Sequence, residues 1–394
     1  MRFAVVGAGA IGTVHARLLE ALDDELVAVV DQDLDRAQKL ADQYGARAYP
    51  DAASAYAEVD AVSICLPSAL HADAAIEALY AGKHVLVEKP VDITLAAADR
   101  LIAAQRETGR TVSVVSQRRF QEPVVRIKEA VESGALGRIT SGIVESAFYR
   151  PQSYYDGDGW RGTLAVDGGG ALMNQGIHAL DLLVWMLGRP VQVSAQTAQL
   201  AHHNLEVEDV AAATITFESG AIGLLLASTA AYPGRAVRLS IHGDQGTAVM
   251  DDDRLVALTT EGGEGAQPRS GRPDEGEGAA GGVGRGVVGA VAGSGLRAET
   301  PGGGEGAERH TSSRPGEGAA GGVGRSVAEA ATPSGADGWG PVQLAHLAQY
   351  RDFVGAVVEG RAPGVGVADG RRALATVLAV YESARVGRPV EVDS

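Results

Sequence analysis

The sequence predicts an α/β protein that begins with a parallel sheet wound with helices and continues into an α+β domain with a large, mainly antiparallel open sheet. Three observations support this prediction. Short apolar runs alternate with helical stretches over the first 120 residues, strand-like runs joined by turns follow from about residue 139, and two long helical stretches close the chain. Strands separated by helices pair in parallel through right-handed crossovers, whereas strands joined by turns pair antiparallel.

The individual elements follow from these patterns in chain order. Apolar runs predict parallel strands at 3–6, 26–30, 61–66, 85–87 and 111–115. A helix near Pro123 opens the second part, whose predicted strands are 139–147, 191–197, 211–217, 221–228 and 237–242. Residues 342–359 and 371–386 are long enough to form helices, and we expect the C-terminal helix to pack back onto the first domain.

A glycine-rich segment interrupts the second part. Residues 261–340 show no sustained helical or strand period, and the decapeptide GEGAAGGVGR occurs there twice, at 276–285 and 316–325. We expect this segment to be a disordered or loosely ordered insertion. The 394 residues are therefore expected to form a first domain, 1–121, and an α+β domain, 122–394, that contains the insertion.

Charge, cysteine content and hydropathy argue against several classes of protein. The formal net charge is -16, and nucleic-acid binding, which needs clustered Lys and Arg, is not expected. The single cysteine, Cys65, can form neither an internal disulfide nor a metal-ligand cluster, which favours a reducing compartment. The first residues leave no room for a signal peptide, and no apolar run reaches membrane-spanning length. We therefore expect a cytoplasmic protein with no membrane partner.

A glycine motif and a later acidic residue predict that the first domain is a Rossmann dinucleotide-binding domain. Gly7, Gly9 and Gly12 form the pattern GxGxxG between the first strand and the following helix. The first glycine makes the tight turn, the second lets the backbone approach a pyrophosphate, and the third lets helix and strand pack. Asp31 ends the next strand, where a carboxylate can bind the adenosine ribose hydroxyls and would repel a 2′-phosphate. NAD is therefore expected rather than NADP.

The same pattern at 276–281 is not expected to be a nucleotide site. It lies inside the glycine-rich segment and no strand precedes it. A GxGxxG pattern has this function only between a strand and a helix.

The nonapeptide GKHVLVEKP at 82–90 places Glu88, Lys89 and Pro90 directly after a strand of the predicted parallel sheet. Open α/β sheets bind ligands at the carboxyl ends of their strands. The chain has only four lysines, and two of them lie in this segment. A lysine supplies a compact ammonium group with an adjustable pKa, which suits proton transfer. The alternative is a surface lysine that pairs with Glu88.

A second cluster, DGGGALMNQGIHALD at 167–181, contains Asn174, His178 and Asp181 at helical spacing, which predicts that they share one helix face. The unperturbed pKa of histidine suits proton exchange with a hydroxyl or carbonyl near neutrality, and Asp181 is placed to orient the ring. The alternative is a histidine that caps the helix or is satisfied in the core.

On these motifs the sequence resembles the Gfo/Idh/MocA oxidoreductase family. The resemblance rests on GAGAIG at 7–12, PSALH at 67–71, GKHVLVEKP at 82–90, GGGALMNQGIHALD at 168–181 and IHGDQGTAVM at 241–250. It implies that Lys89 and His178 flank the sugar or cyclitol carbon that exchanges hydride with the nicotinamide. It also implies a homodimer or homotetramer that associates through the sheet of the second domain.

The resemblance has one departure and one refinement. Many members have aspartate four residues before the histidine, where this chain has Asn174, whose amide can bind a hydroxyl but cannot take a proton. YYD at 154–156, WRGT at 160–163 and YPG at 232–234 look most like the branch of UDP-N-acetylhexosamine and hexosaminuronate 3-dehydrogenases. This branch implies substrate contacts at Tyr155, Trp160 and Arg161, and arginine suits a phosphate or carboxylate. The alternative is that Trp160 packs at the domain junction and Arg161 forms a salt bridge.

The predicted site combines these motifs. The catalytic residues are Lys89, His178 and Asn174, the last two also contact substrate, and no metal is expected. His71 is expected to face the nicotinamide or to be a plain helix-start residue, and Gln117 and Arg119 to line the cleft or to form interdomain hydrogen bonds. The predicted cofactor contacts are Gly7, Gly9, Ala10, Ile11, Gly12, Asp31, Leu66, Pro67, His71, Glu88, Lys89 and Gln117.

The sequence thus predicts an NAD-dependent oxidoreductase that transfers hydride between the nicotinamide and a secondary alcohol of a small-molecule sugar, cyclitol or nucleotide sugar. Two alternatives stay open. One is an NAD(P)H-dependent keto-sugar reductase that runs the reverse reaction. The other is a non-catalytic NAD-binding sensor or scaffold, since a fold alone does not prove chemistry.

Overall fold

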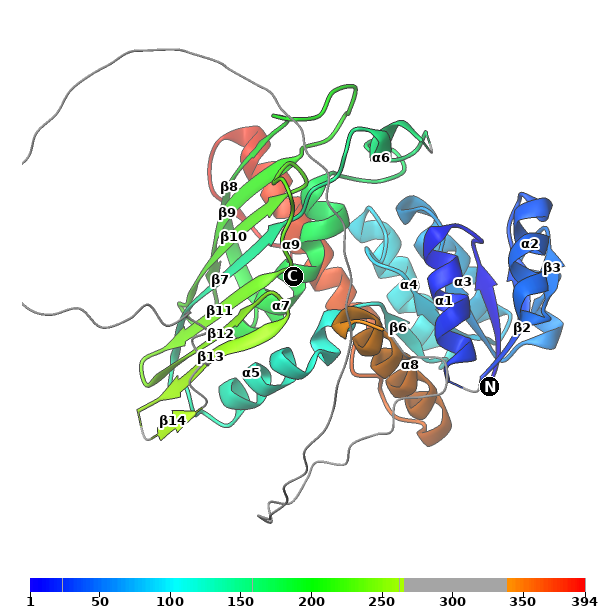
Figure 1. The fold of residues 1–394 in the computed structure, drawn as a ribbon, viewed down its shortest axis with the longest axis horizontal. Coiled ribbons are helices and arrows are strands. Elements are labelled where there is room, and N and C mark those ends of the chain that lie inside the picture. The colour runs from blue at the N-terminus through cyan, green and yellow to red at the C-terminus, as the bar shows by residue number, and fades with distance from the viewer. Residues whose placement is uncertain (23, 158, 262, 266–338, 394) are drawn as a thin grey trace, which may run out of the picture. The chain divides into compact units, whose positions relative to one another are not determined.

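The computed structural model describes residues 1–22, 24–157, 159–261, 263–265 and 339–393 (Figure 1). The predicted insertion, 261–340, with its repeated decapeptide and its second GxGxxG pattern, lies almost entirely outside these residues. None of the helices within the described ranges is both long and apolar enough to cross a membrane.

The first sheet has six parallel strands in the order β3-β2-β1-β4-β5-β6. Its strands are β1 (Arg2–Val6), β2 (Glu25–Val30), β3 (Arg47–Tyr49), β4 (Ala61–Ile64), β5 (His84–Val87) and β6 (Val112–Val114). The helices that connect them are α1 (Ala10–Glu20), α2 (Leu34–Tyr44), α3 (His71–Tyr80) and α4 (Leu95–Thr108). The strand order reverses between β1 and β4, which opens a crevice at their carboxyl ends. The predicted Rossmann fold is confirmed.

Burial explains why the strands of this sheet are almost continuously apolar. Phe3, Ala4, Val5 and Val6 of β1 are all buried, since helices cover both faces of the sheet. The edge strand β3 was not predicted, because a run of three half-exposed or exposed residues leaves no apolar period to detect.

The second sheet has nine strands in the order β14-β13-β12-β11-β7-β10-β9-β8-β15. They are β7 (Ile139–Ala147), β8 (Pro190–Ala198), β9 (Val210–Phe217), β10 (Ile222–Ser228), β11 (Arg238–Gly243), β12 (Gly246–Asp251), β13 (Arg254–Thr260), β14 (Gly263–Gly265) and β15 (Val390–Glu391). Neighbours are antiparallel except β7 and β10, which are parallel. The predicted, mainly antiparallel sheet is confirmed, and β12 to β15 are strands that the sequence did not predict.

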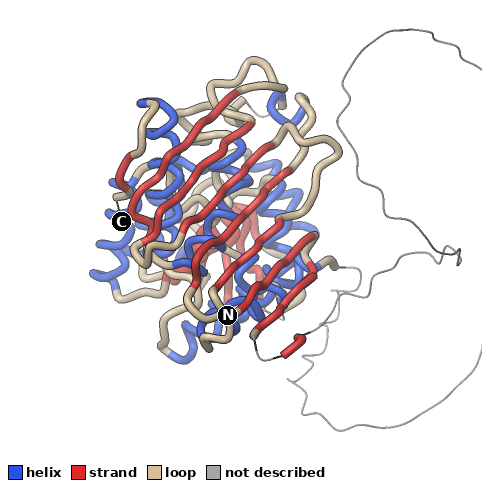
Figure 2. The backbone as a smooth tube through the Cα atoms, turned by 90° about the vertical axis from the view of Figure 1, so that its left-hand side faces the viewer, coloured by secondary structure: helices blue, strands red, loops and turns tan. Residues whose placement is uncertain are grey.

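Helices cover one face of this sheet and leave the other open, as Figure 2 shows. The second part contains α5 (Glu122–Glu132), the short α6 (Ser153–Asp156), α7 (Ile177–Leu187) and α9 (Val367–Val386). Buried and exposed residues alternate along β9 and β10, as expected for a sheet with one covered face. The open face carries exposed apolar side chains on β7 and β10, namely Ile143, Ile222, Leu224 and Leu226.

The last two helices lie in the chain between β14 and β15 of the second sheet, and both pack on the first sheet. Tyr350 and Phe353 of α8 (Pro341–Glu359) contact Phe3 of β1, with ring centroids 6.0 and 6.2 Å apart. Gly370 of α9 lies against Val114 of β6. The C-terminal segment therefore joins the parallel sheet to the rest of the fold, and the division of the chain at residue 121 stays a prediction.

A buried polar cluster secures α8 to α1. Tyr350 Oη lies 2.6 Å from Ser63 Oγ and 2.7 Å from His15 Nδ1, and His15 Nε2 lies 3.1 Å from Glu88 Oε1. The ring of His346 stacks edge-on against His15. Burial, together with the neighbouring His15, lowers the pKa of His346 to about 3.

This cluster predicts that the protein loses stability in mild acid. In the unfolded chain His346 takes up a proton near pH 6.5, whereas in the folded protein it does so only near pH 3. The free energy of unfolding therefore falls as the pH drops from about 6.5 towards 3. At about 1.4 kcal/mol per pH unit, the loss between pH 7 and pH 5 is about 2 kcal/mol. Guanidinium unfolding at both pH values measures it. The His346→Gln variant should lack this part of the pH dependence, and an identical dependence in both proteins would contradict the assignment.

Candidate active site

The glycine motif forms the tight turn between β1 and α1 that the sequence predicted. Gly7 has a φ of 103°, and a Cβ there would overlap the carbonyl oxygen of Cys65. A Cβ at Gly12 would overlap the carbonyl oxygen of Gly7, whereas a Cβ at Gly9 would meet no atom within 4 Å. Gly7 and Gly12 are therefore required by packing. Gly9 instead leaves open space, as needed where a pyrophosphate approaches the backbone.

A cleft of about 890 Å³ extends from this turn to the start of α7. Residues from the glycine loop, the ends of β4 and β5, the segment after β6, and the loops around α6 line it together. The lining residues are Gly9, Ala10, Ile11, Val14, Arg36, Cys65, Leu66, Pro67, Ser68, His71, Glu88, Lys89, Gln117, Arg150, Tyr154, Trp160, Arg161, Asn174 and His178. Most of the predicted site residues are among them. Gly7, Gly12, Asp31 and Tyr155 are not.

Asp31 lies at the end of β2, next to the glycine turn. Its carboxylate accepts hydrogen bonds from the backbone N–H groups of Ala8 and Asp33, each 2.9 Å long. Arg36 of α2 lies 3.8 Å from Asp31 and lines the cleft. The glycine turn, with open space at Gly9, and the Asp31 carboxylate beside it fit an adenine dinucleotide. The carboxylate favours NAD over NADP.

The neighbouring Asp31 and Arg36 predict how the preference between NAD and NADP can be changed. Removing the Asp31 charge leaves Arg36 to bind a 2′-phosphate, so Asp31→Ser should raise kcat/KM with NADP relative to NAD by about 10- to 100-fold, or about 1.4–2.7 kcal/mol. Steady-state kinetics with both coenzymes measures the ratio. Adding Arg36→Ala should remove the gain, and an unchanged ratio in Asp31→Ser would show that Asp31 does not select the coenzyme.

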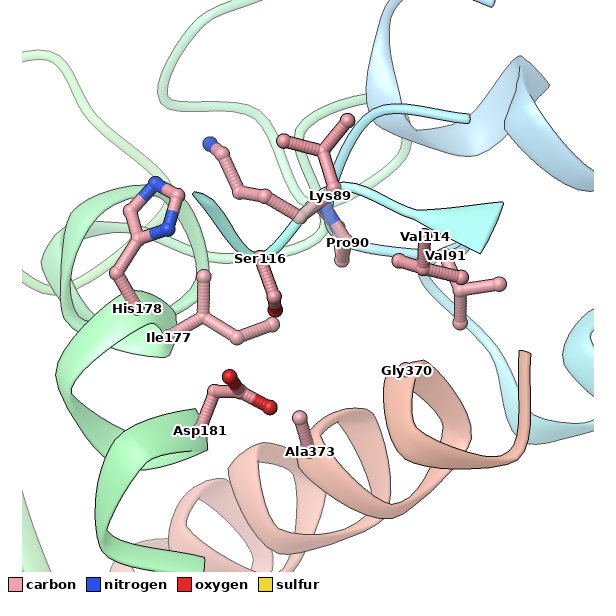
Figure 3. A pocket seen from close by; sticks show the side chains of 11 residues that line it. Lys89, Pro90, Val91, Val114, Ser116, Ile177, His178, Asp181, Gly370 and Ala373 are labelled. Carbon is pink, nitrogen blue, oxygen red and sulfur yellow. The ribbon is translucent and has the colours of Figure 1, made fainter. Parts of the chain in front are cut away.

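Lys89 follows β5 and extends towards the His178 ring on α7, as Figure 3 shows. Its Nζ donates a hydrogen bond of 2.9 Å to the backbone carbonyl of Asn174. Glu88 Oε2 accepts from the backbone N–H of Lys89, and Oε1 lies beside His15. Glu88 is thus a buried structural carboxylate, and the alternative of a surface lysine paired with its side chain does not describe the structure.

The segment before α7 differs from the regular helix that the spacing predicted. Residues Leu172–Gly176 (η4) form a π-helical turn, a feature that often occurs at functional sites. The buried Glu208 carboxylate accepts from the backbone N–H groups of Gly170 and Leu172, at 3.0 and 2.8 Å, so it satisfies donors at the start of the turn. A Cβ at Gly170 would overlap the Glu208 carbonyl, which explains why this position of the GGG run is a glycine.

This turn and the first residues of α7 present Asn174 and His178 to the cleft. Asn174 Nδ2 donates to Asp167 Oδ1 over 3.0 Å. Burial and the positive charges of Lys89 and Arg118 lower the pKa of His178 well below its usual value. His178 is therefore a neutral imidazole at neutral pH, with a nitrogen that can accept a proton.

Comparison with known proteins identifies the family. Residues 1–116 match the family model of oxidoreductases with an NAD-binding Rossmann fold, and residues 124–249 match that of the GFO/IDH/MocA C-terminal domain. The chain is 31% identical to the myo-inositol 2-dehydrogenase of Thermotoga maritima over 279 residues, which cover 67% of this chain and 80% of that protein. The chain belongs to the Gfo/Idh/MocA oxidoreductase family.

One other relative is named for a nucleotide sugar, and one similar structure contains one. The UDP-N-acetylglucosamine 3-dehydrogenase of Acidithiobacillus ferrooxidans is 30% identical over 241 residues, 61% of this chain and 71% of that protein. The structure of the WlbA dehydrogenase from Bordetella pertussis, in complex with NADH and UDP-GlcNAcA, matches with a TM-score of 0.74 and 26% identity, covering 100% of this chain and 99% of that chain. The predicted family, NAD-binding domain and oxidoreductase class are confirmed.

Tyr155, a predicted substrate contact, is not among the residues that line the cleft. Tyr155 is buried, and its hydroxyl donates to Thr229 Oγ1 over 2.9 Å. Its neighbour Tyr154 lines the cleft instead, with the guanidinium groups of Arg150 and Arg161 stacked on its ring at 5.1 and 4.6 Å. In the four-residue helix α6, a shift of one position turns a side chain from the cleft to the core, and the sequence could not resolve this.

His71 borders the cleft but is fully engaged in the fold. The ring is 1% exposed, Nδ1 lies 2.6 Å from the carbonyl oxygen of Pro90, and Nε2 lies 2.7 Å from that of Leu66. The imidazole therefore holds the segments after β4 and β5 together. This geometry favours the alternative of a structural residue at the start of α3 over direct contact with the nicotinamide.

One long-range ion pair engages both Arg119 and Asp181. Arg119 is buried and binds Asp181 through two hydrogen bonds of 2.8 and 2.6 Å. Arg119 thus fulfils the alternative of a structural contact and does not line the cleft, whereas Gln117 does. Asp181 is occupied by the guanidinium and does not orient His178, which lies one helical turn away.

Sequence reasoning missed Arg36, Arg150 and Tyr154 among the cleft residues. Arg36 lies three residues after the Asp33 side chain that caps α2, so its place near the nucleotide side was in principle detectable. Arg150 lies in an irregular segment between β7 and α6, where no periodicity assigns a direction to a side chain.

Proposed function

We propose that this protein oxidises a secondary alcohol of a sugar, cyclitol or nucleotide sugar, with Lys89 and His178 as the residues that handle the hydroxyl proton. The observation that supports it most directly is one cleft that contains the open Gly9 turn, the Lys89 ammonium and the neutral imidazole of His178. The inositol, UDP-sugar and WlbA relatives act on, or bind, molecules of this class, as their names state.

The residues divide the chemistry as follows. Bound NAD would supply the hydride acceptor, held by the glycine turn and Asp31. Neutral His178 accepts the hydroxyl proton at a ring nitrogen, because its lowered pKa keeps that nitrogen free near neutral pH. Lys89 donates a hydrogen bond to the substrate oxygen, which stabilises the negative charge that develops there. Asn174 orients a substrate hydroxyl through its amide. The reverse reaction on a keto-sugar uses the same groups.

The cleft also contains features that suit an anionic substrate. The guanidinium groups of Arg150 and Arg161 both stack on the ring of Tyr154, and both arginines line the cleft. The Nε atom of Arg150 is buried, and no hydrogen-bond partner for it occurs among the described residues. A phosphate or carboxylate would satisfy that donor and accept bidentate hydrogen bonds. We therefore place UDP-hexosamine derivatives ahead of free cyclitols as substrates.

A substrate panel tests the proposal. The purified protein is mixed with NAD and, in turn, myo-inositol, free hexoses, UDP-N-acetylglucosamine and UDP-N-acetylglucosaminuronate, and absorbance at the NADH band is followed. Turnover on UDP sugars alone supports the nucleotide-sugar proposal, whereas turnover on inositol alone supports a cyclitol dehydrogenase. The proposed function would be contradicted if the protein binds NAD tightly but turns over none of these compounds with NAD and none of the matching keto-sugars with NADH.

We also propose that the protein is a homodimer or homotetramer that associates through the open face of the nine-stranded sheet. Leu224 and Ile143 are register partners on the parallel β10 and β7, and both are at least 40% exposed. An exposed apolar patch on a sheet face is typical of an interface.

Leu224→Asp should weaken this association at least 10-fold, because it places a charge inside an apolar interface. Light scattering after size-exclusion chromatography measures the mass. Val358→Asp is the matched control, since Val358 is also exposed and apolar but lies on α8. A wild-type protein that is monomeric at all concentrations would contradict the proposal.

A further inference from the structure

Asp167 is a buried carboxylate that joins two parts of the cleft wall. It is 2% exposed, its Oδ2 accepts from the backbone N–H of Gly162 and its Oδ1 accepts from Asn174 Nδ2, both over 3.0 Å. Gly162 follows directly after Trp160 and Arg161, which line the cleft. One side chain thus connects the loop of the predicted substrate contacts to the π-helical turn of Asn174.

The carboxylate decides which way the Asn174 amide faces. If the amide were reversed, its oxygen would face the Asp167 oxygen and the hydrogen bond would be lost. In the observed orientation, Asn174 Oδ1 points away from Asp167 and accepts from Gln175 Nε2 over 3.2 Å. The backbone carbonyl of the same Asn174 accepts from Lys89 Nζ over 2.9 Å. Asp167 therefore fixes the residue that holds the Lys89 ammonium.

The electrostatics agree with this geometry. Burial raises the pKa of Asp167, and hydrogen bonds from Gly162 and Asn174 and the positive charges of Lys89 and Arg161 act against that rise. A carboxylate at position 174 would lie against the Asp167 carboxylate, and two carboxylates at about 3 Å cannot both ionise. The site thus accommodates one negative charge in this pair, and here position 167 carries it.

We propose that Asp167 is a positioning residue for the reaction: it carries the single negative charge of the Asp167–Asn174 pair and holds Asn174 and Lys89 in place for proton exchange with the substrate. This inference rests on the proposed function. It also explains why asparagine is compatible with activity at a position where many members of the family have aspartate.

A charge-swap experiment tests this role with the full-length protein and the substrate that the panel identifies. Asn174→Asp and Asp167→Asn should each lower kcat/KM about 100-fold, because the first crowds two carboxylates and the second removes the charge. The double variant moves the charge to position 174, and its kcat/KM should return to within about 10-fold of wild type. In Asn174→Asp, the acid limb of the pH profile of kcat/KM should move to higher pH.

Controls separate positioning from simple packing. The melting temperature and NAD affinity of each variant report on folding. Asp209→Asn removes another buried carboxylate, one that accepts backbone N–H groups of Leu200 and Ala201, and should lower the melting temperature without moving the pH profile. If Asp167→Asn does not fold, Asn174→Asp alone decides through its loss of activity and its shifted acid limb.

The outcomes are distinct. Recovery in the double variant supports the proposal. Additive losses in the double variant, or an unchanged pH profile in Asn174→Asp, would overturn it while leaving the proposed function intact. Lack of turnover by the wild-type protein on the whole panel would overturn the proposed function and this inference together.

Discussion

Lys89→Met should lower kcat by about 10³-fold, equivalent to about 4 kcal/mol, and leave NAD affinity within a few-fold of wild type. Methionine keeps the length of the side chain but removes the ammonium that contacts the Asn174 carbonyl and, as proposed, the substrate oxygen. His178 can still accept the hydroxyl proton, but the negative charge that develops on the substrate oxygen is no longer stabilised by the ammonium. Stopped-flow or steady-state absorbance measures kcat, and fluorescence titration measures NAD binding.

The chain offers a matched control for this variant. Lys83 lies in the same nonapeptide, and its Nζ donates to the Val59 carbonyl over 3.0 Å, outside the cleft. Lys83→Met should therefore keep kcat within about twofold of wild type, since it removes one hydrogen bond of ordinary strength. Equal losses in both variants would show that the effect of Lys89→Met is structural.

Gly12→Ala should abolish detectable NAD binding and lower the melting temperature. The added Cβ would overlap the Gly7 carbonyl oxygen, a backbone atom, so α1 must move away from the turn. Overpacking of this kind costs about 1–3 kcal/mol, and the displaced α1 no longer directs its N-terminus at the pyrophosphate. Calorimetric titration with NAD and a thermal melt measure the two effects.

Gly9→Ala separates the two effects. A Cβ at Gly9 meets no protein atom within 4 Å, so the variant should melt as wild type does, yet the methyl group occupies space needed by the cofactor. We expect at least a 10-fold loss of NAD affinity. Unchanged affinity in Gly9→Ala would place the dinucleotide elsewhere.

Local sequence patterns were enough to predict the Rossmann domain, its GxGxxG turn and the segment around Lys89. The GxGxxG turn and the segment around Lys89 depend on neighbouring residues in a strand and the loop after it, so their conformations follow from short-range rules. The alternation along β9 and β10 likewise predicts a sheet with one covered face.

The contacts that the sequence did not predict share a different cause. The partner of Asp181 is Arg119, 62 positions away, and the Glu208 carboxylate that supports η4 comes from a distant segment. Neither pairing has a local signal. The segment that Glu208 contacts forms a π-helical turn, so spacing arguments that assume 3.6 residues per turn do not apply there. Tyr154 lines the cleft and Tyr155 does not. Tyr155 instead has a distant contact of the same kind, its hydrogen bond to Thr229.

We propose that hydride passes directly, within one cleft, between a substrate carbon and the nicotinamide. The measurement that tests it most directly uses a panel substrate carrying deuterium on the carbon that is oxidised, followed by mass spectrometry of the NADH formed. We predict one deuterium per NADH formed with the wild-type protein, and about 10³-fold less labelled NADH in the same time with Lys89→Met. Deuterium released into water, with unlabelled NADH, would contradict direct transfer of hydride.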